Sequence, residues 1–241
     1  MANRDLTNRY VGHTCTLGVM KLLVFDVEGT LFQTKVRLPG AHIDSTIWQA
    51  LASSLGEQAV REEVATHARW AAGGYDNYLE WMRDTIAIHR RHGLSGSLFR
   101  RVIAAAEYHP EVLETLSRID RRSYEVVLVS GGFRELCSRV QLDLTVNHCF
   151  AACEYLFGED DTLKSFNLLP CDFHGKIDFI RLLLREYGLS QDDWIFVGDG
   201  LNDVPIASEA PLSIGFRPHE KLRSVVTHTV DNFSEVLALI R

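Results

Sequence analysis

The sequence LLVFDVEGTL, at residues 22–31, decides the fold. Its first four residues are apolar, which is typical of a strand buried on both faces in a parallel sheet. Asp26 and Glu28 follow directly, and Gly29 then indicates a turn. Two acids at the end of a buried strand cost several kcal/mol unless they are paired or hold a cation. Because ligands of an open α/β sheet bind at the carboxyl ends of its strands, this stretch predicts a site with chemistry.

Two later stretches repeat this arrangement. The apolar residues 126–129 (VVLV) end in Ser130-Gly131-Gly132, and the apolar residues 194–197 (WIFV) end in the sequence GDGLND at 198–203. If the three strands are parallel neighbours, the polar clusters that follow them meet at one edge of the sheet. The sequence therefore predicts one site built from three separate segments.

Helical periodicity without any strand signal covers residues 34–106, with helices expected over 43–54, 57–72, 76–92 and 97–106. From residue 107 onward strands and helices alternate, which implies a parallel sheet with right-handed crossovers. We therefore predict an α/β fold, a Rossmann-like doubly wound parallel sheet with an all-helical insertion. The expected later strands are 124–129, 194–197, 211–214 and 227–230, with a hairpin-like excursion at 148–163; the expected helices are 111–119, 133–141, 176–187, 203–209, 218–225 and 233–240.

Composition limits the class of protein. The 241 residues are 46% hydrophobic and 24% charged, as in an ordinary globular protein, and the formal net charge of −7 argues against nucleic acid as the main partner. No apolar run is long enough to span a membrane. Five cysteines in a chain of this length fit a reducing compartment, and residues 1–19 lack the pattern of a signal peptide. We therefore expect a cytoplasmic protein, a monomer or homodimer, with no nucleic-acid or membrane partner.

The motifs Asp-x-Glu-Gly-Thr, Ser-Gly-Gly-Phe, Lys176 and Gly-Asp-Gly-x-Asn-Asp, in this order, resemble those of the haloacid dehalogenase (HAD) superfamily. The second and fourth motifs look most like the phosphoserine-phosphatase-like branch, and the resemblance extends from residue 20 to 241. It implies a helical cap at 34–106, a core at 20–33 and 107–241, and a tail at 1–19. It also implies a Mg²⁺-dependent phosphatase that acts on a small phosphorylated metabolite through an aspartyl-phosphate.

The resemblance makes Asp26 the nucleophile and Glu28 the general acid and base. Members of the phosphoserine-phosphatase-like branch usually carry a second Asp in place of Glu28, and its longer side chain shifts the proton donor. Enolase-phosphatases of the same superfamily carry Asp-x-Glu-Gly-Thr, so Glu is compatible with phosphatase activity. Dehalogenase members lack an acid there, which argues against carbon–halogen chemistry.

The resemblance also implies a metal site of oxygen ligands. Asp26, Asp199 and the backbone carbonyl of Glu28 would bind Mg²⁺, a hard ion that keeps part of its water shell. Asp203 would ligate the ion, orient a water bound to it, or support Lys176.

The phosphate-binding residues implied by the resemblance are Ser130, Gly131, Lys176 and Asn202. Backbone N–H groups of the two glycines, expected at the start of a helix, would contact phosphate oxygens together with the Ser130 side chain. Lys176 would supply positive charge, with Lys164 as a weaker candidate. Asn202 would either bind phosphate or cap the helix that begins near residue 203.

The substrate is less well determined by the sequence. Lys35 stands where phosphoserine phosphatases carry a Glu that binds the amino group, which disfavours free phosphoserine. Lys35 with Arg37 or Arg83 would suit a substrate with a second anionic group.

Three alternatives remain open: a phosphotransferase or mutase of the same fold, a non-catalytic phosphate-binding regulatory protein, and a zinc site. The zinc site would use His148, Cys149, Cys153, Cys171 and His174. The cap residues Tyr75, Tyr78, Trp81 and Met82 would either line an apolar pocket or form the cap's own core, and their helical spacing favours the core.

Overall fold

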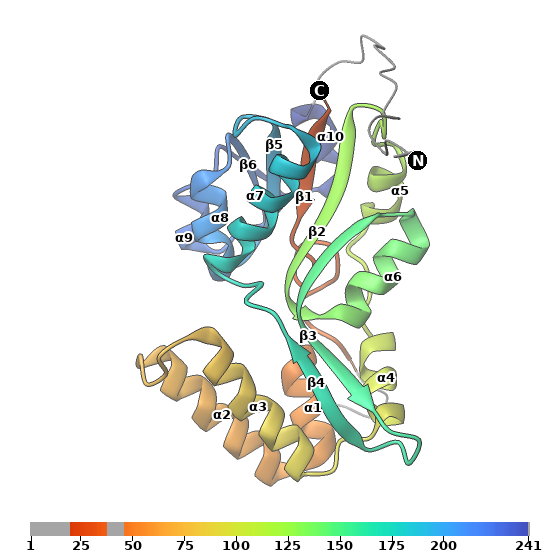
Figure 1. Ribbon diagram of the computed structural model, residues 1–241, viewed down its shortest axis with the longest axis vertical. Coiled ribbons are helices and arrows are strands. Elements are labelled where there is room, and N and C mark those ends of the chain that lie inside the picture. Colours follow the sequence, from red (N-terminus) through yellow and green to blue (C-terminus); the bar gives the residue numbers. More distant parts are fainter. Residues whose placement is uncertain (1–19, 38–45, 241) are drawn as a thin grey trace, which may run out of the picture.

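A computed structural model describes residues 20–37 and 46–240. The predicted tail at 1–19 and the first residues of the predicted helix 43–54 lie outside this range. One sheet organises the fold, with the strand order β4-β3-β2-β1-β5-β6-β7, and every neighbouring pair in it is parallel except β3 and β4 (Figure 1). The strands are β1 (Lys21–Phe25), β2 (Tyr124–Phe133), β3 (His148–Phe157), β4 (Leu163–Leu168), β5 (Trp194–Gly198), β6 (Leu212–Phe216) and β7 (His228–Val230).

Helices cover both faces of this sheet, as a doubly wound fold requires (Figure 1). Successive residues of β1 alternate between two apolar clusters: Leu22 and Val24 pack on one face, and Leu23 and Phe25 pack on the other. The first face carries α7 (Gly175–Tyr187), α8 (Val204–Glu209) and α9 (Glu220–Arg223); the second carries α5 (Val112–Ser117), α6 (Arg134–Leu144), the 3-10 turn η2 (Phe233–Glu235) and α10 (Val236–Leu239). This is the predicted fold class.

The strand order places the site. The chain moves outward from β1 through β2 to β3 on one side and continues through β5 to β7 on the other. Strand β1 is therefore flanked by β2 and β5, and the connections leave β1 in opposite directions. A crevice forms at the carboxyl end of β1, where such a reversal occurs, and ligands of open α/β sheets bind there.

The predicted insertion is described over 34–37 and 46–106, and in these ranges its regular elements are helices, with no strand. It consists of α1 (Ile47–Leu55), α2 (Glu57–Ala71), α3 (Tyr78–Arg91) and α4 (Gly96–Ala104). Three helices begin at side chains that accept hydrogen bonds from backbone N–H groups, namely Thr46, Asn77 and Ser95. Gly56 separates α1 from α2 at φ 111°, a conformation that favours glycine. These local signals explain why the predicted helix ends agree with the structure within a few residues.

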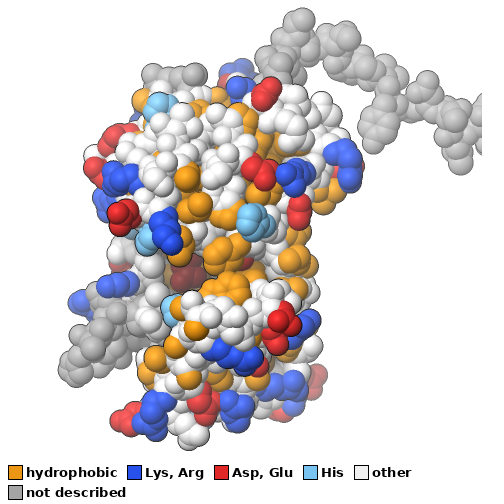
Figure 2. All heavy atoms as spheres, turned by 90° about the vertical axis from the view of Figure 1, so that its left-hand side faces the viewer, with side chains coloured by type: hydrophobic (Ala, Val, Ile, Leu, Met, Phe, Trp, Pro, Cys, Tyr) orange, Lys and Arg blue, Asp and Glu red, His pale blue; other side chains and the backbone are white. Residues whose placement is uncertain are grey.

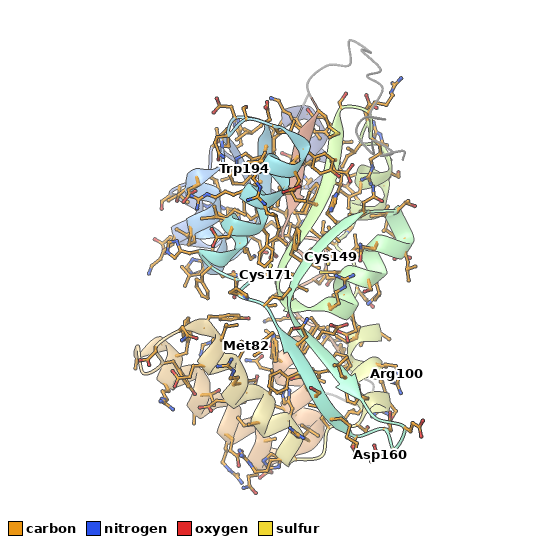
Figure 3. All side chains as sticks on the ribbon, in the orientation of Figure 1. Met82, Arg100, Cys149, Asp160, Cys171 and Trp194 are labelled. Atoms are coloured by element: carbon orange, nitrogen blue, oxygen red, sulfur yellow. The ribbon has the colours of Figure 1, made fainter. Side chains whose placement is uncertain are left out.

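The β3–β4 hairpin extends beyond the core sheet and packs on this insertion (Figures 1 and 3). The Tyr155 ring lies 5.2 Å from the Phe99 ring, and the Tyr155 hydroxyl lies 2.8 Å from Nδ1 of His89. At the hairpin's end, Arg100 of α4 makes a 3.1 Å ion pair with Asp161. We use the word cap for residues 46–106, and the hairpin fixes this cap to the core at a second place.

Within the described ranges, no helix combines the length and the apolar character that crossing a membrane requires.

Candidate active site

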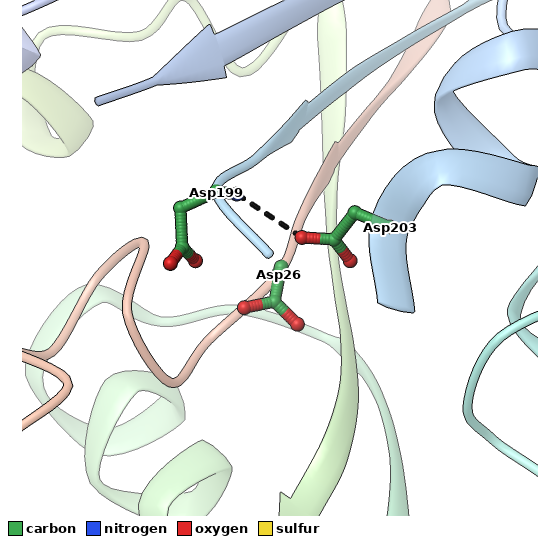
Figure 4. Close-up of side chains that lie close together, drawn as sticks. All are labelled: Asp26, Asp199 and Asp203. Atoms are coloured by element: carbon green, nitrogen blue, oxygen red, sulfur yellow. Dashed lines mark hydrogen bonds between the residues drawn. The ribbon is translucent and has the colours of Figure 1, made fainter. Parts of the chain in front are cut away.

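Three aspartates and one lysine meet at the carboxyl end of β1 (Figure 4 shows the aspartates). Asp26 follows β1, Asp199 follows β5, and Asp203 closes the 3-10 turn η1 (Leu201–Asp203). Lys176, in the first turn of α7, donates hydrogen bonds of 2.6 Å to Asp26 Oδ1 and 2.7 Å to Asp203 Oδ1. Lys176 and Asp203 are completely buried and Asp26 is 4% exposed. The predicted convergence of separate segments therefore occurs.

Asp203 organises the turn that carries Asp199. Its Oδ2 accepts hydrogen bonds from the backbone N–H groups of Asp199, at 3.0 Å, and of Gly200, at 2.9 Å. Since Oδ1 is bonded to Lys176, both oxygens of Asp203 have protein partners. Of the roles implied for Asp203, this geometry favours support of Lys176.

Gly29 allows Asp199 to approach β1 closely. Its φ is 99°, and a Cβ at this position would lie 2.3 Å from Asp199 Oδ2. Thr30, the next residue, donates a 2.8 Å hydrogen bond to Asp199 Oδ1. The turn predicted from Gly29 thus has a second purpose, because it makes room for a carboxylate from another strand. Sequence analysis did not assign Thr30, although it belongs to the first motif.

The charges of this cluster depend on one another. Burial, and after it the negative charge of Asp203, raise the pKa of Asp199 to about 7. Burial favours the neutral amine of Lys176, but Asp203 and Asp26 hold the pKa of Lys176 above its ordinary value. One lysine therefore faces three acids, and the cluster has room for a further positive charge.

The donor set fits a magnesium ion. Carboxylate oxygens of Asp26, Asp199 and Asp203 lie within 4.8 Å of one another. Oδ2 of Asp26 and Oδ2 of Asp199 have no protein hydrogen-bond partner among the described residues, whereas both oxygens of Asp203 do. Oxygen atoms of this type are the ligands that Mg²⁺ prefers. Within the same described ranges this is the one cluster of potential metal ligands, and the histidines and cysteines of the zinc alternative form none.

Glu28 extends from the strand end toward the second motif. A Cβ on Gly132 would lie 2.9 Å from Glu28 Oε2, so the missing side chain of Gly132 leaves space for the longer acid. Burial raises the pKa of Glu28, and a hydrogen bond with the backbone of Ile47 at the start of α1 opposes this rise; the resulting pKa is about 7. A carboxyl group of this kind can hold a proton near neutral pH, as a general acid must.

The second motif has a different backbone from the one predicted. Strand β2 continues through Ser130, Gly131 and Gly132 to Phe133, with a break in its pairing to β3, and α6 begins only at Arg134. The two glycines therefore lie in an irregular strand and not at a helix start. Ser130 Oγ accepts a 3.0 Å hydrogen bond from the N–H of Gly132. Ser130 and Gly131 line the cavity next to Asp26, as expected.

Asn202 and Asp172 form a pair that the sequence did not suggest. Asn202 Nδ2 donates a 2.8 Å hydrogen bond to Asp172 Oδ1, and both residues line the cavity. Burial raises the pKa of Asp172, against the opposing charge of Lys176. Asp172 lies in the loop before α7, where one acid in an irregular segment carries no recognisable signal.

A cavity of about 540 Å³ lies between core and cap, with Asp26, Glu28 and Asp199 in its wall. Figure 2 shows hydrophobic side chains gathered around the hollow between the two parts. Tyr78, Trp81 and Met82 line it, so the expectation that they serve the cap's own core is wrong. Figure 3 places Met82 on the side of the cap that faces the core. Helical spacing does not show whether an apolar face covers a core or a ligand.

The cations proposed for substrate binding lie elsewhere. Lys35, Arg37 and Arg83 are exposed, and none of them lines the cavity. The expectation of a second anionic group on the substrate therefore loses its basis, and so does the argument from Lys35 against phosphoserine. Lys164 is also remote, since it makes an exposed ion pair with Asp160.

Comparisons with known proteins agree with this geometry. A family model for haloacid dehalogenase-like hydrolases matches residues 20–211. The phosphoserine phosphatase of Lactococcus lactis is 26% identical over 212 residues, covering 87% of this chain and 89% of that protein. That of Streptococcus thermophilus is 29% identical over 200 residues, covering 82% and 84% respectively.

A solved structure shows the same fold. A phospho-aspartyl intermediate analogue of phosphoserine phosphatase superposes with a TM-score of 0.74 at 20% identity, covering 93% of this chain and 100% of that one. The matches confirm the predicted superfamily and its phosphoserine-phosphatase-like branch, and they support the predicted enzyme class, a phosphomonoesterase. The chain belongs to the haloacid dehalogenase-like hydrolases.

Proposed function

We propose that the protein is a Mg²⁺-dependent phosphatase that hydrolyses a small phosphorylated metabolite through an aspartyl-phosphate on Asp26. The observation that carries this proposal is the position of Asp26. Its carboxylate is bonded to Lys176 at 2.6 Å, neighbours Asp199, and borders a cavity beneath the cap. A buried nucleophile beside a fixed cation suits attack on a phosphorus atom, where most of the catalysis is positioning and charge stabilisation.

In the first half of the reaction, a carboxylate oxygen of Asp26 attacks the phosphorus. The bond between phosphorus and the ester oxygen breaks, and Glu28 donates its proton to that leaving oxygen. In the second half, Glu28 takes a proton from a water molecule that attacks the same phosphorus. The bond between phosphorus and Asp26 then breaks, which releases inorganic phosphate and restores both acids.

Asp26, Asp199 and the backbone carbonyl of Glu28 would hold Mg²⁺, which supplies positive charge to the phosphate oxygens. Lys176 contributes charge to the same oxygens, and Asp203 keeps its ammonium in place through the 2.7 Å hydrogen bond. Ser130, Gly131 and Asn202 line the same cavity, where they would border the bound phosphate. In this proposal Asp203 acts through Lys176 and the Asp199 turn.

The cap has a separate task. Tyr78 of α3 donates a 2.7 Å hydrogen bond to the backbone carbonyl of Gly131, so the cap contacts the phosphate-binding segment directly. A closed cap excludes bulk water while the aspartyl-phosphate forms. We propose that the cap domain extends over residues 34–106, beyond the helical part 46–106 for which we use the word cap, and that residues 20–33 and 107–241 form the catalytic core.

Phosphate release from a broad panel of phosphorylated metabolites, with Mg²⁺ and with EDTA, tests the proposal. We expect metal-dependent release from one chemical class and none from the Asp26→Asn variant with its fold retained. Consumption of ester without free phosphate, and only in the presence of an added alcohol, would instead identify a phosphotransferase. A folded protein that binds Mg²⁺ and consumes no ester would refute the enzymatic proposal.

Glu28→Asp tests the second of the two acids in the first motif. Shortening the side chain moves the proton donor away from the space beside Gly132, and a displacement of this size costs on the order of 10- to 100-fold in rate. We therefore expect lower kcat on the preferred ester with little change in KM. A higher kcat for Glu28→Asp would show that the longer acid is not required by this site.

A further inference from the structure

The lining of the active-site cavity is rich in carboxylates, although the proposed substrate brings a negatively charged phosphate group. Among the described residues, no lysine or arginine lines this cavity, and residues 38–45 contain neither residue type. Besides Asp26, Asp199 and Glu28, the lining includes the carboxylates of Glu63, on the cap, and of Asp172, in the core loop before α7. His67 of α2 is the one basic side chain among these lining residues, and the lining offers no lysine or arginine to pair with a second anionic group on a substrate.

Glu63, on α2, is available to a ligand. Its side chain makes no hydrogen bond or ion pair with any described residue, although it is half-buried and lines the cavity. Burial alone raises its pKa, to about 7. A carboxylate in this environment gains from any cation that enters the cavity, because the cation replaces the hydration that burial removes.

A cationic group on the substrate would compensate the charges of Glu63 and Asp172 in particular, because the three aspartates near the phosphate would already have cations of their own. In the proposed function, Lys176 and a divalent cation match the three formal charges of Asp26, Asp199 and Asp203. Asp172 has a hydrogen bond from Asn202 and no ion pair of its own, and Glu63 has neither. A carboxylate on the substrate would add to this negative charge, whereas an ammonium group would offset it.

Aromatic side chains surround the same space. Trp48 of α1 and Tyr78 and Trp81 of α3 line the cavity, together with Met82. Aromatic rings attract ammonium groups and also cover the apolar carbons attached to them. A volume of about 540 Å³ leaves room for a small organic group beside a phosphate.

We propose that the substrate is the phosphate ester of an amino alcohol, with its phosphate at Asp26, its positively charged nitrogen among Glu63 and the cap aromatics, and no carboxylate. This inference rests on the proposed function and names the class of substrate for the same site. It differs from phosphoserine, which carries a carboxylate next to its ammonium group.

Four phosphate esters separate the effect of an ammonium group on the substrate from the effect of a carboxylate. O-Phosphoethanolamine carries an ammonium, 2-hydroxyethyl phosphate replaces it with a neutral hydroxyl, O-phosphoserine adds a carboxylate, and 2-phosphoglycolate carries only the carboxylate. We expect kcat/KM for O-phosphoethanolamine to exceed that for 2-hydroxyethyl phosphate on the order of 10-fold, as one charged hydrogen bond provides. We expect both carboxylate esters to be poorer than the neutral one. Equal rates for the ammonium and hydroxyl esters, or a preference for either carboxylate ester, would overturn the proposal.

Glu63→Gln tests the residue itself, with Glu57→Gln as a matched control. Both acids belong to α2 and both substitutions remove one negative charge, but Glu57 is exposed and does not line the cavity. The ratio of kcat/KM between the ammonium and hydroxyl esters should approach one in Glu63→Gln and stay unchanged in Glu57→Gln. An unchanged ratio in Glu63→Gln would remove Glu63 from the proposal and refute it.

Binding to the Asp26→Asn variant separates this inference from the proposed function. Calorimetry with the same four esters reports selectivity without turnover. If the wild-type protein hydrolyses none of them but the variant binds O-phosphoethanolamine more tightly than 2-hydroxyethyl phosphate, the inference stands while the phosphatase proposal fails. If the wild-type protein hydrolyses all four without that preference, the phosphatase proposal stands and the inference fails.

Discussion

Lys176 is the residue on which the geometry of the site depends. Its side chain is completely buried and connects Asp26 with Asp203, which in turn orients the backbone of the Asp199 turn. A buried charge of this kind cannot be removed alone, because its partners would remain as uncompensated buried anions. The same lysine therefore has a structural role in addition to the chemical role that we propose for it.

Lys176→Met should lower the free energy of unfolding by about 3–5 kcal/mol in metal-free buffer, because Asp26 and Asp203 lose their shared cation. Denaturant unfolding measures this. Lys164→Met is the matched control: its ion pair with Asp160 is exposed, and we expect a change of less than about 1 kcal/mol. Equal stability of Lys176→Met and wild type would mean that the buried acids do not depend on this lysine.

Sequence reasoning found the residues that carry a pattern and missed those that act from irregular positions. Asp26, Glu28 and Asp199 each follow a buried apolar strand, and this pattern is visible in the sequence. Asp172 and Glu63 have no such signal, because one lies in a loop and the other is one of several acids on an exposed helix. Their importance comes from which cavity they border, and only the folded chain shows it.

At the scale of elements, the contact between α3 and β2 joins the cap to the segment that we propose binds phosphate. Tyr78 bonds to the Gly131 carbonyl, and its ring packs 6.1 Å from that of Phe173 in the loop before α7. Phe173 also contacts Trp70 of α2, at 5.7 Å between ring centroids. Two cap helices therefore contact the second motif, in β2, or the loop that precedes Lys176.

Tyr78→Phe removes only the hydroxyl of this contact. We expect kcat/KM to fall roughly fivefold, the value of one ordinary hydrogen bond, with an unchanged melting temperature of the core. Tyr75→Phe removes a hydroxyl bonded to Asp84 within the cap itself and should leave kcat/KM unchanged. If both variants behave alike, the cap–core hydrogen bond has no part in turnover.

His89 makes the stability of the cap dependent on pH. It is completely buried between α3 and the β3–β4 hairpin, and burial lowers its pKa to about 4. The unfolded chain binds a proton at this side chain below its ordinary pKa of about 6.5, but the folded chain does not until about pH 4. The resulting stabilisation is complete above pH 6.5 and is lost as the pH falls toward 4, by up to about 3 kcal/mol.

Urea unfolding between pH 7 and 4 should show this loss in the wild-type protein. His89→Gln retains an acceptor for the Tyr155 hydroxyl and cannot titrate, so its unfolding free energy should change less over this range. His228→Gln, at an exposed position, should follow the wild type. A wild-type pH dependence in His89→Gln would assign the effect to other groups.

The same scale shows where local sequence signals fail. Gly131 and Gly132 indicate the end of a strand, yet β2 continues through them because Phe133 pairs with Cys153 of β3. That pairing joins segments separated in the chain by a whole helix. Glycine patterns report local freedom of the backbone, and the partner strand decides whether the strand continues.

At the scale of the whole molecule, alternating strands and helices were enough to predict a doubly wound sheet with a helical insertion. The alternation follows from local periodicity and from the handedness of crossovers. The packing of the β3–β4 hairpin on the cap was not predictable in the same way. Tyr155 contacts Phe99 and His89, which lie more than fifty positions earlier in the sequence, and no local signal records such a contact.

The β3–β4 hairpin is one of several connections that hold the cap against the core. The cap is connected to the core by the chain at both ends of the insertion, by the hairpin, and by the aromatic contacts around Phe173. The cavity lies between these connections, with the aspartates on the core side and Glu63 on the cap side. The proposed phosphate chemistry and the proposed substrate selection thus use different parts of the chain.

The most direct test of the account is to trap the covalent intermediate. Wild-type protein turning over a phosphate ester in the presence of Mg²⁺ is quenched in acid, and its peptides are analysed by mass spectrometry. If the reaction proceeds through an aspartyl-phosphate on Asp26, we expect one phosphate on the peptide that contains Asp26, attached to that side chain, and none in the Asp26→Asn variant. Rapid phosphate release with Asp26 unmodified, or with the phosphate on another residue, would contradict it.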